Sequence, residues 1–178
     1  SLLARSAGKL TNQINKNSIK AACGNDQAAV MQRNGAEKEF FAAVAHLEQH
    51  GNNAMVVLSD AKGCFPNTNI MEAFESLCNN CPEAVGYFIS AYGERGLTTY
   101  IERNHETGEL ERVFKFLEDG LVQGEVQATN TATILNADVR EKNNKVEGIT
   151  HKNYVDDEKF LAVVANEDGD VNMDVVEA

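Results

Sequence analysis

The chain has 178 residues, of which 43% are hydrophobic, and its 27 acidic side chains outnumber 16 basic ones. This length favours one compact domain, and the hydrophobic fraction excludes disorder throughout the chain. The formal charge of −11 weighs against a nucleic-acid partner, because phosphate binding depends on lysine and arginine. No apolar run reaches the roughly 18 residues of a membrane span. Four irregularly spaced cysteines indicate an intracellular, reducing compartment and not a disulfide framework.

The charge is unevenly distributed along the chain. Residues 1–54 hold six basic side chains against four acidic ones, whereas residues 156–178 hold eight acidic side chains and only Lys159. An acidic run of this kind is usually a solvated surface. We therefore expect residues 168–178 to form an acidic tail.

Two helical segments are predicted in the first 50 residues. Residues 1–24 carry apolar residues at helix-like intervals, interrupted by a polar run. A second helix is predicted to begin after Asn34, with Asn34 as its cap and Glu37 as the partner in a capping box. The phenylalanines of the chain are predicted to belong to the core. They are Phe40, Phe41, Phe74, Phe88, Phe114 and Phe116.

The rest of the chain alternates strands and helices. A short apolar run at 55–58 predicts a buried strand that leads to Asp60. Asn69 and Pro82 each begin a predicted helix. Four more strands and one long helix are predicted, at residues 98–103, 110–117, 149–155 and 160–165 and at residues 125–142. This irregular order predicts an α+β fold, a sheet with helices covering one face.

Carboxylates lie at the ends of two predicted strands. Asp60 follows the strand at 55–58, and Asp156-Asp157 lie at the tip of a predicted hairpin. Adjacent acids repel one another unless cations neutralise them or solvent surrounds them. One interpretation is a shared Mg²⁺ site, in which two ions about 3.5 to 4 Å apart assist phosphoryl transfer. The other interpretation is an exposed acidic turn.

Cys78 and Cys81 have the spacing of a zinc-binding or redox pair, and His46 and His50 are available to complete four zinc ligands. A single Cys-x-x-Cys is weak evidence, and these cysteines extend the apolar face of a predicted helix. Core packing is therefore the favoured interpretation.

Three segments resemble the motifs of reverse transcriptases, in that family's order. Ser59-Asp60-Ala61-Lys62-Gly63-Cys64-Phe65 resembles the first palm motif, as found in non-LTR retrotransposon and group II intron enzymes. Gly120-Leu121-Val122-Gln123-Gly124 resembles the second motif, and Tyr154-Val155-Asp156-Asp157 resembles the Tyr-x-Asp-Asp box. Residues 1–10 and 27–37 are similar to the finger segments before the first motif. The resemblance covers nearly the whole chain.

The resemblance implies a polymerase palm-like antiparallel sheet with helices on one face, plus partial helical fingers. The fingers would occupy 1–54 and the palm 55–167. The implied activity is RNA-directed DNA synthesis, a nucleotidyl transfer that uses an RNA template, a DNA primer, deoxynucleotides and two Mg²⁺ ions.

The resemblance also implies roles for individual residues. Asp60, Asp156 and Asp157 would be the catalytic carboxylates and the metal ligands. Five further residues would form the nucleotide-binding site: Phe65 as a steric gate against a 2′-hydroxyl, Gln123 and Gly124 in the nucleotide and template pocket, Tyr154 near the primer end, and Arg33 at the triphosphate.

The chain departs from the family pattern at two places. The family's arginine for the triphosphate falls at Met31, with Arg33 as the nearest substitute. Glu125-Val126-Gln127 follows Gln123-Gly124, where the family usually has a small or acidic residue and then Pro-Leu-Ser. A second hypothesis is therefore an inactive remnant of this fold that serves as a structural or interaction subunit of a larger protein complex.

Overall fold

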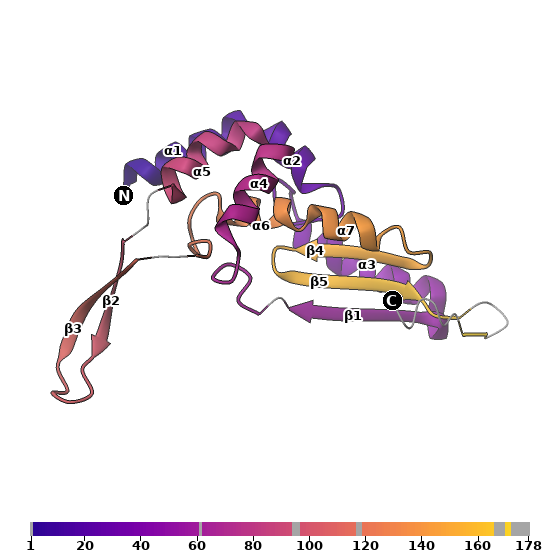
Figure 1. The fold of residues 1–178 in the computed structure, drawn as a ribbon. Coiled ribbons are helices and arrows are strands. Elements are labelled where there is room, and N and C mark those ends of the chain that lie inside the picture. Colours follow the sequence, from indigo (N-terminus) through magenta and orange to yellow (C-terminus); the bar gives the residue numbers. More distant parts are fainter. Residues whose placement is uncertain (1, 61, 94–96, 117–118, 166–169, 172–178) are drawn as a thin grey trace.

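The computed structural model describes residues 2–60, 62–93, 97–116, 119–165 and 170–171. The elements of the first third, drawn in indigo to magenta in Figure 1, are α1 (Leu2–Ile14), α2 (Lys16–Cys23), α3 (Gly35–His50), the 3-10 turn η1 (Gly51–Asn53) and β1 (Ala54–Asp60). The helical region expected at 1–24 is thus two helices that meet at Asn15. All but two residues of the expected acidic tail, 168–178, lie outside the described residues.

The remaining elements are α4 (Ile70–Asn80), α5 (Pro82–Tyr92), β2 (Leu97–Arg103), β3 (Leu110–Phe116), α6 (Ala128–Leu135), α7 (Ala137–Asn143), β4 (Ile149–Tyr154) and β5 (Asp157–Val163). The α+β fold class is confirmed. The prediction of one long helix at 125–142 is wrong, because α6 and α7 are separate helices with Asn136 between them. Within the described part of the chain, no helix has the length and apolar character to cross a bilayer.

The central sheet has the strand order β1-β5-β4, and both strand pairs are antiparallel. Val155 and Asp156 alone connect β4 to β5, and Val155 has a φ of 63°, as tight hairpin turns require. Strand β5 therefore begins at Asp157, earlier than the predicted start at residue 160. The β2–β3 hairpin forms a second, two-stranded sheet that extends away from the helices in Figure 1.

One face of the central sheet is covered by α3, which lies behind the strands in Figure 1. The Lys159 ammonium on β5 donates a hydrogen bond to the Glu39 carbonyl oxygen of α3 over 2.9 Å. The capping box predicted for α3 is wrong. Asn34 has a φ of 55°, a conformation that asparagine tolerates, and its side chain makes no capping hydrogen bond.

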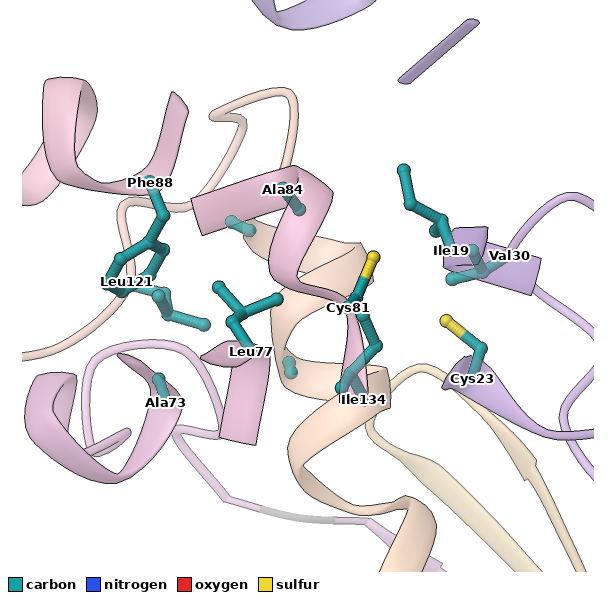
Figure 2. Packing of buried hydrophobic residues seen from close by; sticks show 12 residues of the cluster. Ile19, Cys23, Val30, Ala73, Leu77, Cys81, Ala84, Phe88, Leu121 and Ile134 are labelled. Carbon is teal, nitrogen blue, oxygen red and sulfur yellow. The ribbon is translucent and has the colours of Figure 1, made fainter. Parts of the chain in front are cut away.

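The main hydrophobic core lies among the helices and not against the sheet. Ile19 of α2, Leu77 of α4, Phe88 of α5 and Ile134 of α6 are each at most 2% exposed. Figure 2 shows the Phe88 ring pointing toward Leu121. These packed side chains hold the four helices together through apolar burial.

The prediction that the phenylalanines belong to the core holds only in part. Phe88 is buried and Phe74 packs against the core cluster. Phe40 and Phe41 of α3 are 62% and 65% exposed, so their assignment to the core is wrong. The side chains of Phe114 and Phe116 lie outside the described residues.

The start of α4 gives a test of local stability. The Asn69 side chain accepts hydrogen bonds from the Met71 and Glu72 backbone N–H groups, at 2.9 and 3.1 Å. We expect Asn69→Ala to lower the free energy of unfolding by about 1 kcal/mol, measured by urea denaturation. Asn69→Asp, which keeps the accepting oxygen, is the matched control. Equal losses in both variants would contradict a role for the cap.

Candidate functional site

The three aspartates of the predicted site meet at one end of the central sheet. Asp60, the last residue of β1, is directly opposite Asp157, the first residue of β5, which in turn pairs with Tyr154 on β4. Directly opposite residues have Cα atoms about 4.5 to 5.5 Å apart and side chains on the same face. Asp156 is next to Asp157 in the turn. Strand pairing therefore brings together carboxylates that are far apart in the sequence.

Cys64, just beyond β1, is close to this group of acids. The thiol is partly buried, and burial is the largest cause that raises the pKa of Cys64. The charges of Asp156, Glu158 and Asp60 raise this pKa further, in that order. Charges have this effect only at short range. Glu158, which sequence reasoning missed, thus belongs to the acidic group, and the run Asp156-Asp157-Glu158 was the available signal.

A cavity of about 660 Å³ lies between α3 and the strand ends. Asp60 and Asp157 line it together with Phe40, Glu39 and Lys159. The Lys159 ammonium is 3.7 Å from the Glu39 carboxylate; burial raises the pKa of Glu39, and the Lys159 charge lowers it in part. A volume of several hundred Å³ is typical of small-molecule sites, which range from about 300 to 1,000 Å³. No sequence signal pointed to the Glu39–Lys159 pair.

The carboxylates suit a magnesium ion that arrives with a nucleotide better than a preformed metal cage. Within the described residues, no group of three or more His, Cys, Asp or Glu side chains is arranged to hold a metal ion. Mg²⁺ is commonly bound by one or two carboxylates, with substrate phosphates and water completing its octahedral coordination. Asp60 and Asp157, paired across two strands, are two carboxylates of this kind.

The prediction that the cysteine pair packs in the core holds for Cys81 and is wrong for Cys78. Cys81 is fully buried in the hydrophobic core, whereas Cys78 is exposed on α4. His46, a candidate fourth ligand, forms a 2.9 Å hydrogen bond with the Ala162 carbonyl oxygen.

The loops that carry the first and second motifs are bonded to each other. The Leu121 N–H donates to the Phe65 carbonyl oxygen over 2.6 Å, and the Gly120 N–H donates to the Thr68 carbonyl oxygen over 3.0 Å. Gly120 has a φ of 88°, and a Cβ atom there would lie 2.5 Å from the Pro66 carbonyl oxygen. Only glycine permits this close approach of the two loops.

The predicted nucleotide-binding residues lie in different surroundings. Gln123 and Gly124 are exposed, and Tyr154 is 40% exposed and lines the cavity. The Phe65 side chain is half-buried and packs against the core cluster. Arg33 is exposed two residues before α3, and among the described residues no contact joins it to the carboxylates. The strand ends thus bring together the three aspartates and Tyr154, and the joined loops bring Phe65 close to the segment that leads to Gln123-Gly124. Arg33 belongs to neither group.

His151 on β4 gives the site region a pH-dependent contribution to stability. The side chain is 0% exposed, and its ring stacks on Phe160 with centroids 4.2 Å apart. Its Nε2 atom is 3.8 Å from a Glu158 carboxylate oxygen. Burial lowers the pKa of His151 below its ordinary 6.5, the Glu158 charge raises it in part, and the Arg140 charge lowers it. The imidazole is therefore neutral in the folded chain at neutral pH.

We expect His151 to make the folded chain less stable in mild acid. The unfolded chain binds the proton at higher pH than the folded chain, so the free energy of unfolding falls as the pH drops below about 6.5. This loss ends once the pH is below the lowered pKa of the folded state. Urea denaturation at about pH 7.5 and about pH 5.5 measures the difference. The difference in the free energy of unfolding between the two pH values should be smaller in His151→Gln than in the wild type. His105→Gln, which changes an exposed histidine, is the control and should behave like the wild type. An unchanged difference in His151→Gln would contradict this role.

Comparison with known proteins identifies the fold. No protein-family model and no curated protein matches the chain. A similar solved structure is apo telomerase from Candida tropicalis truncated of its C-terminal domain, with 16% identity, a TM-score of 0.59, and coverage of 95% of this chain and 36% of that one.

A second similar structure is telomerase from Candida albicans in complex with a TWJ fragment of telomeric RNA. It is 11% identical, has a TM-score of 0.54, and covers 90% of this chain and 30% of that chain. The chain thus spans about a third of the length of the telomerases it matches. Identities this low establish the fold alone, and that fold is reverse-transcriptase-like.

Proposed function

We propose that the chain is the palm and part of the fingers of an RNA-directed DNA polymerase that uses two Mg²⁺ ions. The observation that carries this proposal is the β1–β5 register, which pairs Asp60 with Asp157, the residue that follows Asp156. The reverse-transcriptase-like fold and the three motifs in order support it. The form of the first motif favours the non-LTR retrotransposon or group II intron type.

Asp60, Asp156 and Asp157 would hold the metal ions. Bound Mg²⁺ would supply Lewis-acid activation of the primer 3′-hydroxyl and neutralise charge on the leaving pyrophosphate. The contribution of the chain is to hold these carboxylates at one sheet end, so that they need little rearrangement when a nucleotide arrives.

The joined loops of the first and second motifs would form the deoxynucleotide pocket. We assign Phe65 to the sugar, where a 2′-hydroxyl would clash, and Gln123 and Gly124 to the base pair. Gly124 has a φ of 84° and no neighbouring atom within 4 Å of an added Cβ, which leaves room for a substrate. Tyr154 is assigned to the primer end, and Arg33 to the triphosphate.

An RNA template is the proposed partner. A telomerase of this fold was solved with a fragment of telomeric RNA, which supports an RNA partner for this chain. The formal charge of −11 opposes binding to phosphates. We therefore expect weak template binding that weakens further as salt rises.

A second candidate function is a structural or interaction subunit of a larger complex. The observation that favours it is the apolar surface of α1, where Leu2 and Leu3 are both 82% exposed and Ile14 is 71% exposed. Apolar side chains that gather on one exposed helix often mark an interface with another protein.

Primer extension on an RNA template distinguishes the two functions. The proposed polymerase incorporates deoxynucleotides in Mg²⁺, and EDTA stops incorporation. A chain that extends no primer at low salt, yet elutes as a larger species that Leu3→Glu dissociates, would contradict the polymerase and favour the interaction subunit.

A further inference from the structure

The segment that follows Gln123-Gly124 is held by two tyrosines of α5. The Val122 N–H donates to the Tyr92 hydroxyl oxygen over 3.2 Å. The Tyr87 hydroxyl donates to one Glu125 carboxylate oxygen over 2.7 Å, and the other accepts from the Gln127 N–H over 2.8 Å. Bonds on both sides of Gln123-Gly124 thus fix an exposed turn to a helix of the core.

Glu125 is an effective acceptor in this position. Burial raises the pKa of Tyr87 to about 12, and the hydrogen bond to Glu125 contributes to the shift. The phenol therefore stays protonated near neutral pH and donates to the carboxylate. A hydrogen bond to an ionised acceptor is stronger than one between neutral groups.

The N-terminal helix supports the same contact from the other side. A Cβ atom on Gly8 of α1 would lie 2.6 Å from the Tyr87 hydroxyl oxygen and 3.0 Å from the Val126 Cβ atom. The absence of a side chain at Gly8 therefore lets Tyr87 reach Glu125. The Asn12 side-chain amide also donates to the Val126 carbonyl oxygen over 3.2 Å.

We propose that Tyr87 and Glu125 are positioning residues, which hold the Gln123-Gly124 turn in the conformation that receives the incoming deoxynucleotide. Together with Gly8 we call them the brace. The brace acts through the turn and not on the reacting atoms. This inference rests on the proposed polymerase function and adds to it a role for α1 and α5, which carry none of the three motifs.

Tyr87→Phe tests the brace, because it removes the hydroxyl and keeps the ring. We expect the KM for deoxynucleotide to rise about fivefold, the effect of losing one hydrogen bond, while kcat stays within about twofold. Amide hydrogen exchange at Gln127 should become about tenfold faster. Ser18→Ala is the matched control. The Ser18 hydroxyl on α2 donates a hydrogen bond over 3.3 Å to the carboxylate of Glu83, which lies on α5 like Tyr87.

Glu125→Gln is the second variant, which keeps the shape of the side chain but has one accepting oxygen where the carboxylate has two. A similar rise in KM in both variants, with Ser18→Ala unchanged, supports the brace. Unchanged KM and unchanged Gln127 exchange in both variants overturn it, even if the wild type is active. If the wild type extends no primer, the proposed polymerase function is contradicted. Faster Gln127 exchange in Tyr87→Phe, but not in Ser18→Ala, would then still support the brace as the support of the turn.

Discussion

Asp60→Asn is expected to reduce RNA-templated nucleotide incorporation by at least about a thousandfold, because it removes a negative ligand from the proposed metal site. The Asp60 side chain is exposed at the strand end, so the variant should fold normally. Single-nucleotide incorporation with saturating Mg²⁺ measures the rate, and circular dichroism checks the fold. The loss should not be restored by more deoxynucleotide, since the missing group acts on the reacting centre.

Asp138→Asn is the matched control for this prediction. Asp138 is an exposed acid on α7 and does not line the cavity that Asp60 and Asp157 line. Asp138→Asn removes one negative charge, as Asp60→Asn does, so a general electrostatic effect on template binding would appear in both variants. Equal rates in Asp60→Asn and Asp138→Asn would remove Asp60 from the catalytic site.

Leu77→Ala is expected to lower the free energy of unfolding by about 3 kcal/mol. Leu77 is 1% exposed at the centre of the helical core, so truncation leaves a cavity that its neighbours fill only in part. A loss of this size is a large share of the roughly 5 to 15 kcal/mol that stabilises an ordinary domain. Urea denaturation followed by circular dichroism measures it.

Phe41→Ala is the control for the prediction on Leu77, and it removes a larger side chain than Leu77→Ala does. Phe41 is 65% exposed, so its loss should change the free energy of unfolding by less than about 0.5 kcal/mol. A loss in Phe41→Ala as large as that in Leu77→Ala would mean that α3 packs its phenylalanines inward and that the core is not where the structure has it.

Local sequence patterns were sufficient to predict the strands and most of the helices. The apolar run before Asp60 predicted β1, because a strand's character depends on a few adjacent residues. The prediction that this strand is buried is wrong, since Leu58 is 72% exposed and none of the β1 residues is fully buried. Asn69 predicted the start of α4 because capping involves only the next three residues. The carboxylates of the site could be named in advance for the same reason, since each belongs to a short motif.

Features that depend on distant contacts could not be predicted in the same way. The exposure of Phe40 and Phe41 depends on what else covers α3, which no periodicity specifies. The contribution of Glu158 depends on the β1–β5 pairing, which places it with Asp60 and Asp157 in the lining of one cavity. The contact between Tyr87 and Glu125 requires α1, α5 and the loop before α6 to meet, and no spacing in the sequence indicates that meeting.

The proposed function depends most on a divalent cation that Asp60 shares with the adjacent Asp156-Asp157 pair at one end of the sheet. Titration of the ¹⁵N-labelled chain with substoichiometric Mn²⁺ and a deoxynucleoside triphosphate tests it most directly, because the paramagnetic ion broadens nearby amide signals. We predict that the amides of Asp60 and of Asp156-Asp157 broaden together and first, and that excess Mg²⁺ restores them. Broadening at one strand end without the other, or at the acidic C-terminal residues first, would contradict a shared site.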